Sequence, residues 1–156
     1  MKKLLRIKIF ATVFTLLLLL NSLAPGQDFY LCTRVIDGDT ILLDMNGEQE
    51  RVRLIGVDTP ETVHPTKPVK YFGKEASEFT KSMVEGKRVR LEYDWQRRDK
   101  YGRLLAYVYL EDGTFLNAEI IKQGYGFAYT RFPFKYLEEF RQYEREAREN
   151  GKGLWR

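Results

Sequence analysis

The sequence predicts an α+β fold, mainly β, in which five short strands form a small Greek-key barrel with three helices packed outside it. Two observations lead to this fold class. The first half of the chain reads as short strands separated by turn residues, and three later segments carry apolar residues at helical spacing. A length of 156 residues suits one domain with its own core, and an aromatic content of 14% indicates a globular body.

The first 26 residues are expected to lie outside this domain. They begin with four basic side chains, continue with the apolar run Ile9 to Leu20, and end in small and turn-forming residues up to Gly26. This is the layout of a secretory signal, and the run is shorter than the roughly 20 residues that a membrane-spanning helix needs. We therefore expect residues 1–26 to be a signal peptide or, if uncleaved, a membrane anchor, and residues 27–156 to be the folded domain of a secreted or otherwise extracytoplasmic protein.

The charge of the domain is balanced. The whole chain has 26 basic and 22 acidic residues, a net charge of +4. The four basic residues before Asp28 have no acidic counterpart there, so 22 residues of each sign remain in the domain. Overall charge is therefore no evidence for nucleic-acid binding, and a site for a polyanion must be local. The segment from Lys87 to Arg103 is a candidate, with seven basic residues against three acidic ones.

The first three strands are predicted between Phe29 and Val57. Residues 29–36 are strand-like, Asp37-Gly38-Asp39 forms a turn, and residues 40–44 form the second strand. Asn46-Gly47 is a strong hairpin signal. The third strand is expected to return over residues 50–57, and its alternation places Arg51 and Arg53 on one face.

The later elements alternate between helices and strands. A Pro-rich loop over residues 59–68 leads to a helix from Gly73 to Val84, followed by a strand over residues 87–94. The fifth strand is expected over residues 104–110. Two further helices are predicted, over residues 116–123 and 136–149. Five strands with a helix between the third and fourth favour an OB-type barrel, a fold that commonly binds nucleic acids or sugars.

Three carboxylates are expected to meet at one end of the barrel. Asp39 closes the first turn, and Asp58 and Glu61 follow the third strand. Antiparallel pairing through the Asn46-Gly47 turn brings Asp39 and Thr40 close to residues 57 and 58. Carboxylates that converge in this way need a cation or arginines to compensate their charge. Oxygen ligands suit Ca²⁺ or Mg²⁺, whereas one cysteine and one histidine cannot build the usual zinc sites.

Arginines stand near this acidic cluster. Arg53 lies a short distance along the chain from Asp58, and Arg103 follows the loop of Lys100, Tyr101 and Gly102. Planar guanidinium groups suit a phosphate whose charge grows in a transition state. Each motif taken alone also fits a plain turn or loop cap, and the expected register favours the metal interpretation for the set.

The sequence resembles the staphylococcal nuclease-like (thermonuclease) family. The motifs that carry the resemblance span nearly all of the chain after the first segment, in the order of the family: VIDGDT (Val35–Thr40), RLIGVDTPE (Arg53–Glu61), DKYGRLLAYVY (Asp99–Tyr109), LNAEIIKQGYG (Leu116–Gly126) and GLW (Gly153–Trp155). The resemblance implies an OB-type barrel with three helices. It also implies Ca²⁺-dependent cleavage of phosphodiester bonds in DNA and RNA that leaves 3′-phosphate ends.

The resemblance also implies roles for individual residues. Asp39 and Asp58 would be carboxylate ligands of Ca²⁺, and Thr59 would offer its backbone carbonyl. Glu61 would orient or deprotonate the attacking water, while Arg53 and Arg103 would hold the phosphate. The nucleotide pocket would be lined by Lys100, Tyr101 and Tyr129. The chain departs from the family after Tyr129, where it reads Tyr-Thr-Arg, so that Arg131 would contact phosphate in place of a second pocket tyrosine.

Two other functions fit parts of this pattern. A non-catalytic nucleic-acid-binding barrel predicts gaps among the acting positions, but all five are filled: Asp39, Arg53, Asp58, Glu61 and Arg103. A metal-free glycosidase that uses Asp58 and Glu61 would survive a chelator. His64 and Cys32 are interpreted as a loop residue and a buried strand residue. We expect a monomeric enzyme that acts on DNA and RNA.

Overall fold

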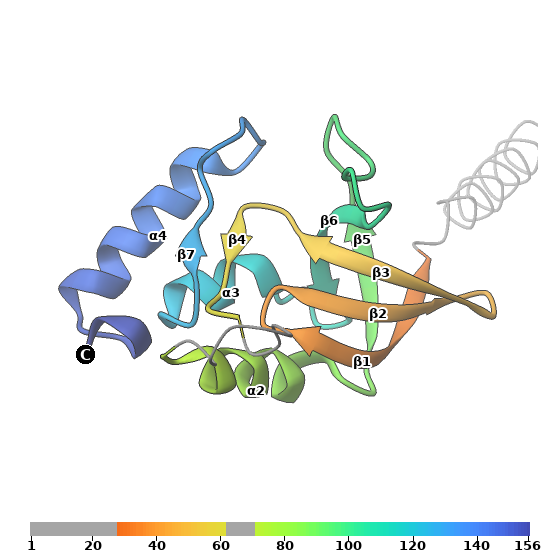
Figure 1. The fold of residues 1–156 in the computed structure, drawn as a ribbon, viewed down its shortest axis with the longest axis horizontal. Helices are drawn as coiled ribbons and strands as arrows, with labels where there is room; N and C mark the ends of the chain where they lie inside the picture. Colours follow the sequence, from red (N-terminus) through yellow and green to blue (C-terminus); the bar gives the residue numbers. More distant parts are fainter. Residues whose placement is uncertain (1–27, 62–70) are drawn as a thin grey trace, which may run out of the picture.

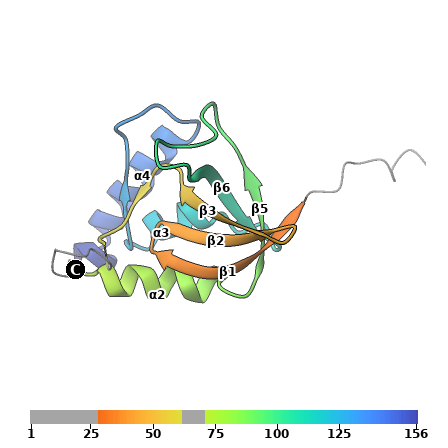
Figure 2. The ribbon, with the colours of Figure 1, turned by 45° about the vertical axis from the view of Figure 1, so that its right-hand side comes forward.

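A computed structural model describes residues 28–61 and 71–156. The predicted signal segment, His64 and most of the Pro-rich loop lie outside the described residues. The described chain forms a closed barrel of five strands in the order β1–β2–β3–β6–β5, as Figures 1 and 2 show. The barrel strands are β1 (Phe29–Asp37), β2 (Thr40–Met45), β3 (Glu48–Leu54), β5 (Arg88–Glu92) and β6 (Leu104–Leu110).

One pairing of the barrel is parallel and the others are antiparallel. β1 pairs with β2, β2 with β3, β5 with β6 and β1 with β5 in antiparallel register, while β3 and β6 run parallel. A parallel pair needs a long connection, which is provided here by the helix α2 (Gly73–Val84) and strand β5. The predicted five-stranded OB-fold barrel with three helices is confirmed.

Alternation along the strands fills the barrel with apolar side chains. In β3, Val52 and Leu54 are fully buried, whereas Arg51 is exposed and Arg53 is half-buried on the opposite face. Cys32 in β1 is also fully buried, and burial raises the pKa of its thiol to about 11. The thiol therefore stays protonated near neutral pH, which agrees with the predicted role of Cys32 as a packing residue.

The third strand was predicted to continue to Val57, and this end is wrong. β3 ends at Leu54, the chain turns through Ile55 and Gly56, and a separate short strand β4 (Val57–Asp58) pairs with β7 (Phe127–Ala128) outside the barrel. Gly56 has a φ of 73°, and a Cβ at this position would lie 2.7 Å from the ring of Phe134. The turn thus depends on a residue without a side chain, and it carries Asp58 away from the barrel sheet.

The helices cover the barrel at one end and one side. α2 lies along β1, α3 (Leu116–Lys122) lies between α2 and α4 (Leu137–Glu149), and α4 flanks the β4–β7 pair in Figure 1. A short 3₁₀ turn, η2 (Gly153–Trp155), ends the chain. The loops after β5 and after β7 rise on the same end of the molecule (Figures 1 and 2). Within residues 28–61 and 71–156, no helix has the length and apolarity that a membrane crossing requires.

Candidate active site

Asp39 lies in the tight turn between β1 and β2, where its carboxylate is almost fully buried. It accepts hydrogen bonds from the backbone N–H of Thr59 at 3.0 Å and from the hydroxyl of Thr40 at 3.0 Å. The turn packs tightly against Thr59, because a Cβ at Gly38 would lie 2.7 Å from the Thr59 hydroxyl oxygen. Asp39 and Thr59, which are 20 residues apart, are thereby joined into one rigid unit.

Arg53 brings the two aspartates together. Its Nη2 lies 3.1 Å from Asp39 Oδ2 and 3.5 Å from Asp58 Oδ1, while its Nη1 donates to the carbonyl oxygens of Val57 at 2.6 Å and Leu54 at 3.1 Å. The two carboxylates therefore face the same point. The register that produces this meeting differs from the expected one: Thr40 pairs with Arg53, not with Val57. Asp58 reaches Asp39 through the turn at Gly56.

These residues line a cavity of about 290 Å³ on the surface of the barrel. Its charged side chains are four carboxylates and three guanidinium groups, those of Asp37, Asp39, Asp58, Glu61, Arg51, Arg53 and Arg103. The two signs nearly balance, so an arriving phosphodiester would meet guanidinium groups next to the carboxylates. Five predicted catalytic and metal-binding side chains thus share one cavity.

Glu61 is exposed at the edge of this cavity, and its backbone packs against the start of α2. The helix begins at Gly73, where a Cβ would lie 2.8 Å from the Glu61 carbonyl oxygen and 3.0 Å from that of Pro60. The backbone of the carboxylate-bearing segment therefore packs directly on the first turn of the helix. Only glycine permits this approach.

Arg103 is held by the loop that precedes it. Its Nε donates to Asp99 Oδ2 at 2.7 Å, and its backbone N–H donates to Asp99 Oδ1 at 3.0 Å. Partial burial would raise the pKa of the Asp99 carboxyl. Hydrogen bonds from Arg103 and from the N–H of Tyr101 outweigh this effect and lower the pKa below its ordinary value. The Asp99 carboxylate stays ionised and fixes the orientation of the guanidinium group.

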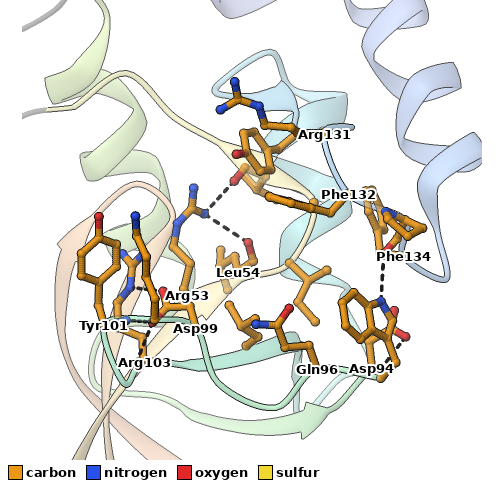
Figure 3. Close-up of a pocket in the computed structure, with 18 residues that line it drawn as sticks. Arg53, Leu54, Asp94, Gln96, Asp99, Tyr101, Arg103, Arg131, Phe132 and Phe134 are labelled. Carbon is orange, nitrogen blue, oxygen red and sulfur yellow. Dashed lines mark hydrogen bonds and ion pairs between the residues drawn. The ribbon is translucent and has the colours of Figure 1, made fainter.

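A second, larger pocket of about 590 Å³ adjoins the first and shares Arg53 and Arg103 with it. The three residues predicted to bind the nucleotide, Lys100, Tyr101 and Tyr129, all line it. Figure 3 shows Tyr101 and Arg103 at its left and Phe132 and Phe134 at its right. Several other residues that line the pocket were not predicted from the sequence, among them Trp95, Gln96, Phe132 and Phe134. Aromatic residues next to basic ones in the sequence, Trp95 before Arg97 and Phe132 after Arg131, are the signal that points to two of them.

The oxygen atoms that could hold a metal are few. Among residues 28–61 and 71–156, no three Asp, Glu, His or Cys side chains lie close enough together to form a metal site by themselves. Asp39 and Asp58 nevertheless converge on one nitrogen of Arg53, and Thr59 adds a neighbouring backbone carbonyl to the same segment. This donor set, two carboxylates and a carbonyl, fits a hard divalent cation that keeps water molecules as its other ligands.

Comparison with known proteins points to one family. A family model described as "Staphylococcal nuclease homologue" matches residues 51–156. The chain is 49% identical over 131 residues to a thermonuclease of Staphylococcus hyicus, which covers 83% of this chain and 77% of that protein. It is 52% identical over 127 residues to a thermonuclease of Staphylococcus intermedius, covering 81% and 75%. Endonuclease YncB of Bacillus subtilis is 44% identical over 125 residues, covering 78% and 59%.

The barrel, the site and these relatives together define the class of protein: this chain is a nuclease, an enzyme that hydrolyses phosphodiester bonds. The chain belongs to the staphylococcal nuclease family. The resemblance inferred from its motifs is confirmed. The roles of the individual site residues stay predictions.

Proposed function

We propose that the chain is an exported, Ca²⁺-dependent nuclease that hydrolyses phosphodiester bonds of DNA and RNA by in-line attack of water and leaves 3′-phosphate ends. One observation carries the proposal. The carboxylates of Asp39 and Asp58 converge on Arg53 within 3.5 Å, in a cavity that Glu61 and Arg103 also line. A fold does not require two carboxylates and two guanidinium groups at one point, whereas hydrolysis at phosphorus uses both.

The proposed metal ligands are the carboxylates of Asp39 and Asp58 and the backbone carbonyl of Thr59. When bound, Ca²⁺ would supply positive charge to a phosphoryl oxygen and bring water near the phosphorus. The hydrogen bonds to Asp39 from Thr59 and Thr40 keep its carboxylate in place. Pre-orientation of this kind lowers the cost of binding a cation, because the ligands need not be ordered first.

Glu61 and the two arginines act on the reacting groups. Glu61 accepts a proton from the attacking water, for which its exposed position at the cavity edge leaves room. Arg53 and Arg103 neutralise the negative charge that grows on the phosphoryl oxygens, a contribution that is typically about 10²–10³ in rate for each group. Both guanidinium groups are fixed beforehand, Arg53 by Asp39 and Arg103 by Asp99.

The nucleotide next to the scissile bond is proposed to lie in the larger pocket, against Lys100, Tyr101 and Tyr129. Tyr101 is 72% exposed, so its ring offers a face to a base or a hydroxyl to a phosphate. Nucleic acid is the proposed partner, and a monomer is sufficient because every proposed group comes from one chain.

The proposal that the protein is exported rests on the first 26 residues alone. The basic start, the short apolar run and the small residues after it support a cleaved signal, with an uncleaved anchor as the alternative. Expression with this segment, followed by fractionation and N-terminal sequencing of the released protein, tests the proposal. Protein that remains in the cytoplasm with its N-terminus intact would contradict export.

The activity is tested by incubating the purified chain with single-stranded DNA, duplex DNA and RNA in the presence of Ca²⁺, Mg²⁺ or a chelator. We expect cleavage with Ca²⁺, none with chelator, and product ends that a 3′-phosphatase can dephosphorylate. Glu61→Gln and Arg103→Ala should each reduce kcat by about 10²-fold or more. Cleavage that survives the chelator would refute the requirement for a metal ion. Binding of nucleic acid without any cleavage would favour the non-catalytic barrel instead.

A further inference from the structure

Exposed aromatic side chains gather around the larger pocket. Among the described residues, five large hydrophobic side chains are exposed, and three of them line this pocket: Trp95 at 67%, Tyr101 at 72% and Phe132 at 59%. Tyr101 belongs to the proposed nucleotide site, whereas Trp95 and Phe132 have no role assigned in it, although the ring centroid of Phe132 lies 6.2 Å from that of Tyr129. Exposed aromatics that cluster at a concave surface mark a binding site more often than isolated ones do.

The side chains of Trp95 and Phe132 are called the aromatic wall. Hydrogen bonds join the two loops that carry it. The indole Nε1 of Trp95 donates to the carbonyl oxygen of Pro133 at 3.0 Å, across 38 positions of sequence. Just before it, the Asp94 carboxylate accepts from the N–H of Trp95 at 2.8 Å, the N–H of Lys135 at 2.9 Å and the hydroxyl of Tyr107 at 2.5 Å. The loops after β5 and after β7 are thus tied together, and the Trp95 ring is held against the loop that carries Phe132.

The wall is continuous with the candidate active site and carries positive charge. Arg53 and Arg103 line both pockets, and Arg131 lines the larger one beside Phe132. In Figure 3, Arg131 lies at the top of the pocket with Phe132 below it, and Tyr101 and Arg103 lie at the left. Aromatic faces interleaved with arginines are the arrangement that binds a single nucleic-acid strand, because the bases stack on the rings and the phosphates meet the cations.

We propose that Trp95 and Phe132 form a second base-stacking subsite, which holds the unpaired base next to the nucleotide bound at Tyr101, with Arg131 at the phosphate between them. The inference rests on the proposed nuclease function and extends it. Stacking accepts every base, so the subsite selects for an unpaired base and not for a sequence. The affinity of the enzyme for its substrate therefore depends on the base next to the scissile nucleotide.

Steady-state kinetics on two substrates test the subsite. One substrate is a nitrophenyl phosphodiester of a single nucleoside, which has one base, and the other is a 12-nucleotide single strand of DNA. We expect Trp95→Ala and Phe132→Ala to raise KM for the 12-mer about fivefold or more. For Trp95→Ala, kcat and the kinetics on the one-base substrate should match wild type, since only binding remote from the reacting bond is lost. Trp95→Phe should restore most of the affinity.

Tyr71→Ala is the matched control, because Tyr71 is 79% exposed and does not line the pocket. Equal KM values for Trp95→Ala, Phe132→Ala and wild type on the 12-mer would overturn the subsite while leaving the nuclease function intact. If wild type cleaves neither substrate, the proposed function itself fails.

A binding measurement supplies an independent readout. In the Glu61→Gln variant, a 12-mer that stacks on Trp95 should quench the tryptophan fluorescence. Trp155 is the one other tryptophan in the sequence, and it packs against Phe127. Adding Trp95→Phe should therefore abolish the quenching. Quenching that persists in the Trp95→Phe protein would contradict stacking at this residue.

Discussion

Replacing Arg53 by methionine should weaken both the fold and the reaction, for separate reasons. Methionine keeps much of the length of the side chain and removes its charge. The Arg53 side chain is 16% exposed and that of Asp39 is 10% exposed, so the variant leaves a nearly buried carboxylate without its counter-ion. It also removes the donors that satisfy the carbonyl oxygens of Val57 and Leu54.

The size of the loss follows from these contacts. Breaking a buried ion pair by removing one partner costs about 3–5 kcal/mol. The second pair contributes little, because the side chain of Asp58 is 52% exposed. Since water reaches part of the site, we take the lower end, about 3 kcal/mol of unfolding free energy, or roughly 10 °C in Tm for a domain of this size. The loss of phosphate neutralisation should reduce kcat by about 10²–10³.

A double-mutant cycle separates the two effects. Urea unfolding of wild type, Arg53→Met, Asp39→Asn and the double variant measures the coupling between the residues. Because the stability loss comes from an unpaired carboxylate, Asp39→Asn in the Arg53→Met background should recover about 1 kcal/mol or more of unfolding free energy. Catalysis should not recover. If the double variant is less stable than Arg53→Met, the ion pair does not explain the instability and the reasoning fails.

Three further predictions concern the surroundings of the site. Gly73→Ala places a methyl group 2.8 Å from the Glu61 carbonyl oxygen, so kcat should fall about tenfold and Tm should decrease. Asp99→Asn removes the charge that orients Arg103, so kcat should fall about tenfold with little change in KM. Burial opposes ionisation of Asp94, but hydrogen bonds from Tyr107 and Lys135 outweigh it and hold its pKa below the ordinary 3.8. Its contribution to stability is present above about pH 4 and lost below, so wild type should lose unfolding free energy in acid more steeply than Asp94→Asn.

Controls sharpen these tests. Gly47→Ala alters a hairpin glycine with open space around it, so it should reduce stability and leave kcat unchanged. Equal kcat for Gly73→Ala and wild type would show that the first turn of α2 does not position Glu61. For Asp99→Asn, a large rise in KM at constant kcat would assign the loop to substrate binding. Parallel acid-denaturation curves for wild type and Asp94→Asn would remove Asp94 from the account of pH stability.

Local patterns in the sequence determined the barrel and much of its site. Alternation in β3 placed Arg51 and Arg53 opposite Val52 and Leu54, as the burial of the last two confirms. Asn46-Gly47 set the hairpin. Such features depend on residues a few positions apart, and for that reason they can be read from the chain.

The tertiary structure decided how distant segments meet. Asp58 reaches Asp39 only because the chain turns at Gly56 and β4 pairs with β7, a strand about 70 residues further along the chain. The aromatic wall depends on a hydrogen bond between Trp95 and Pro133. These contacts join side chains that are far apart in the sequence and meet only when the helices and strands pack together. No local pattern of residues predicts them.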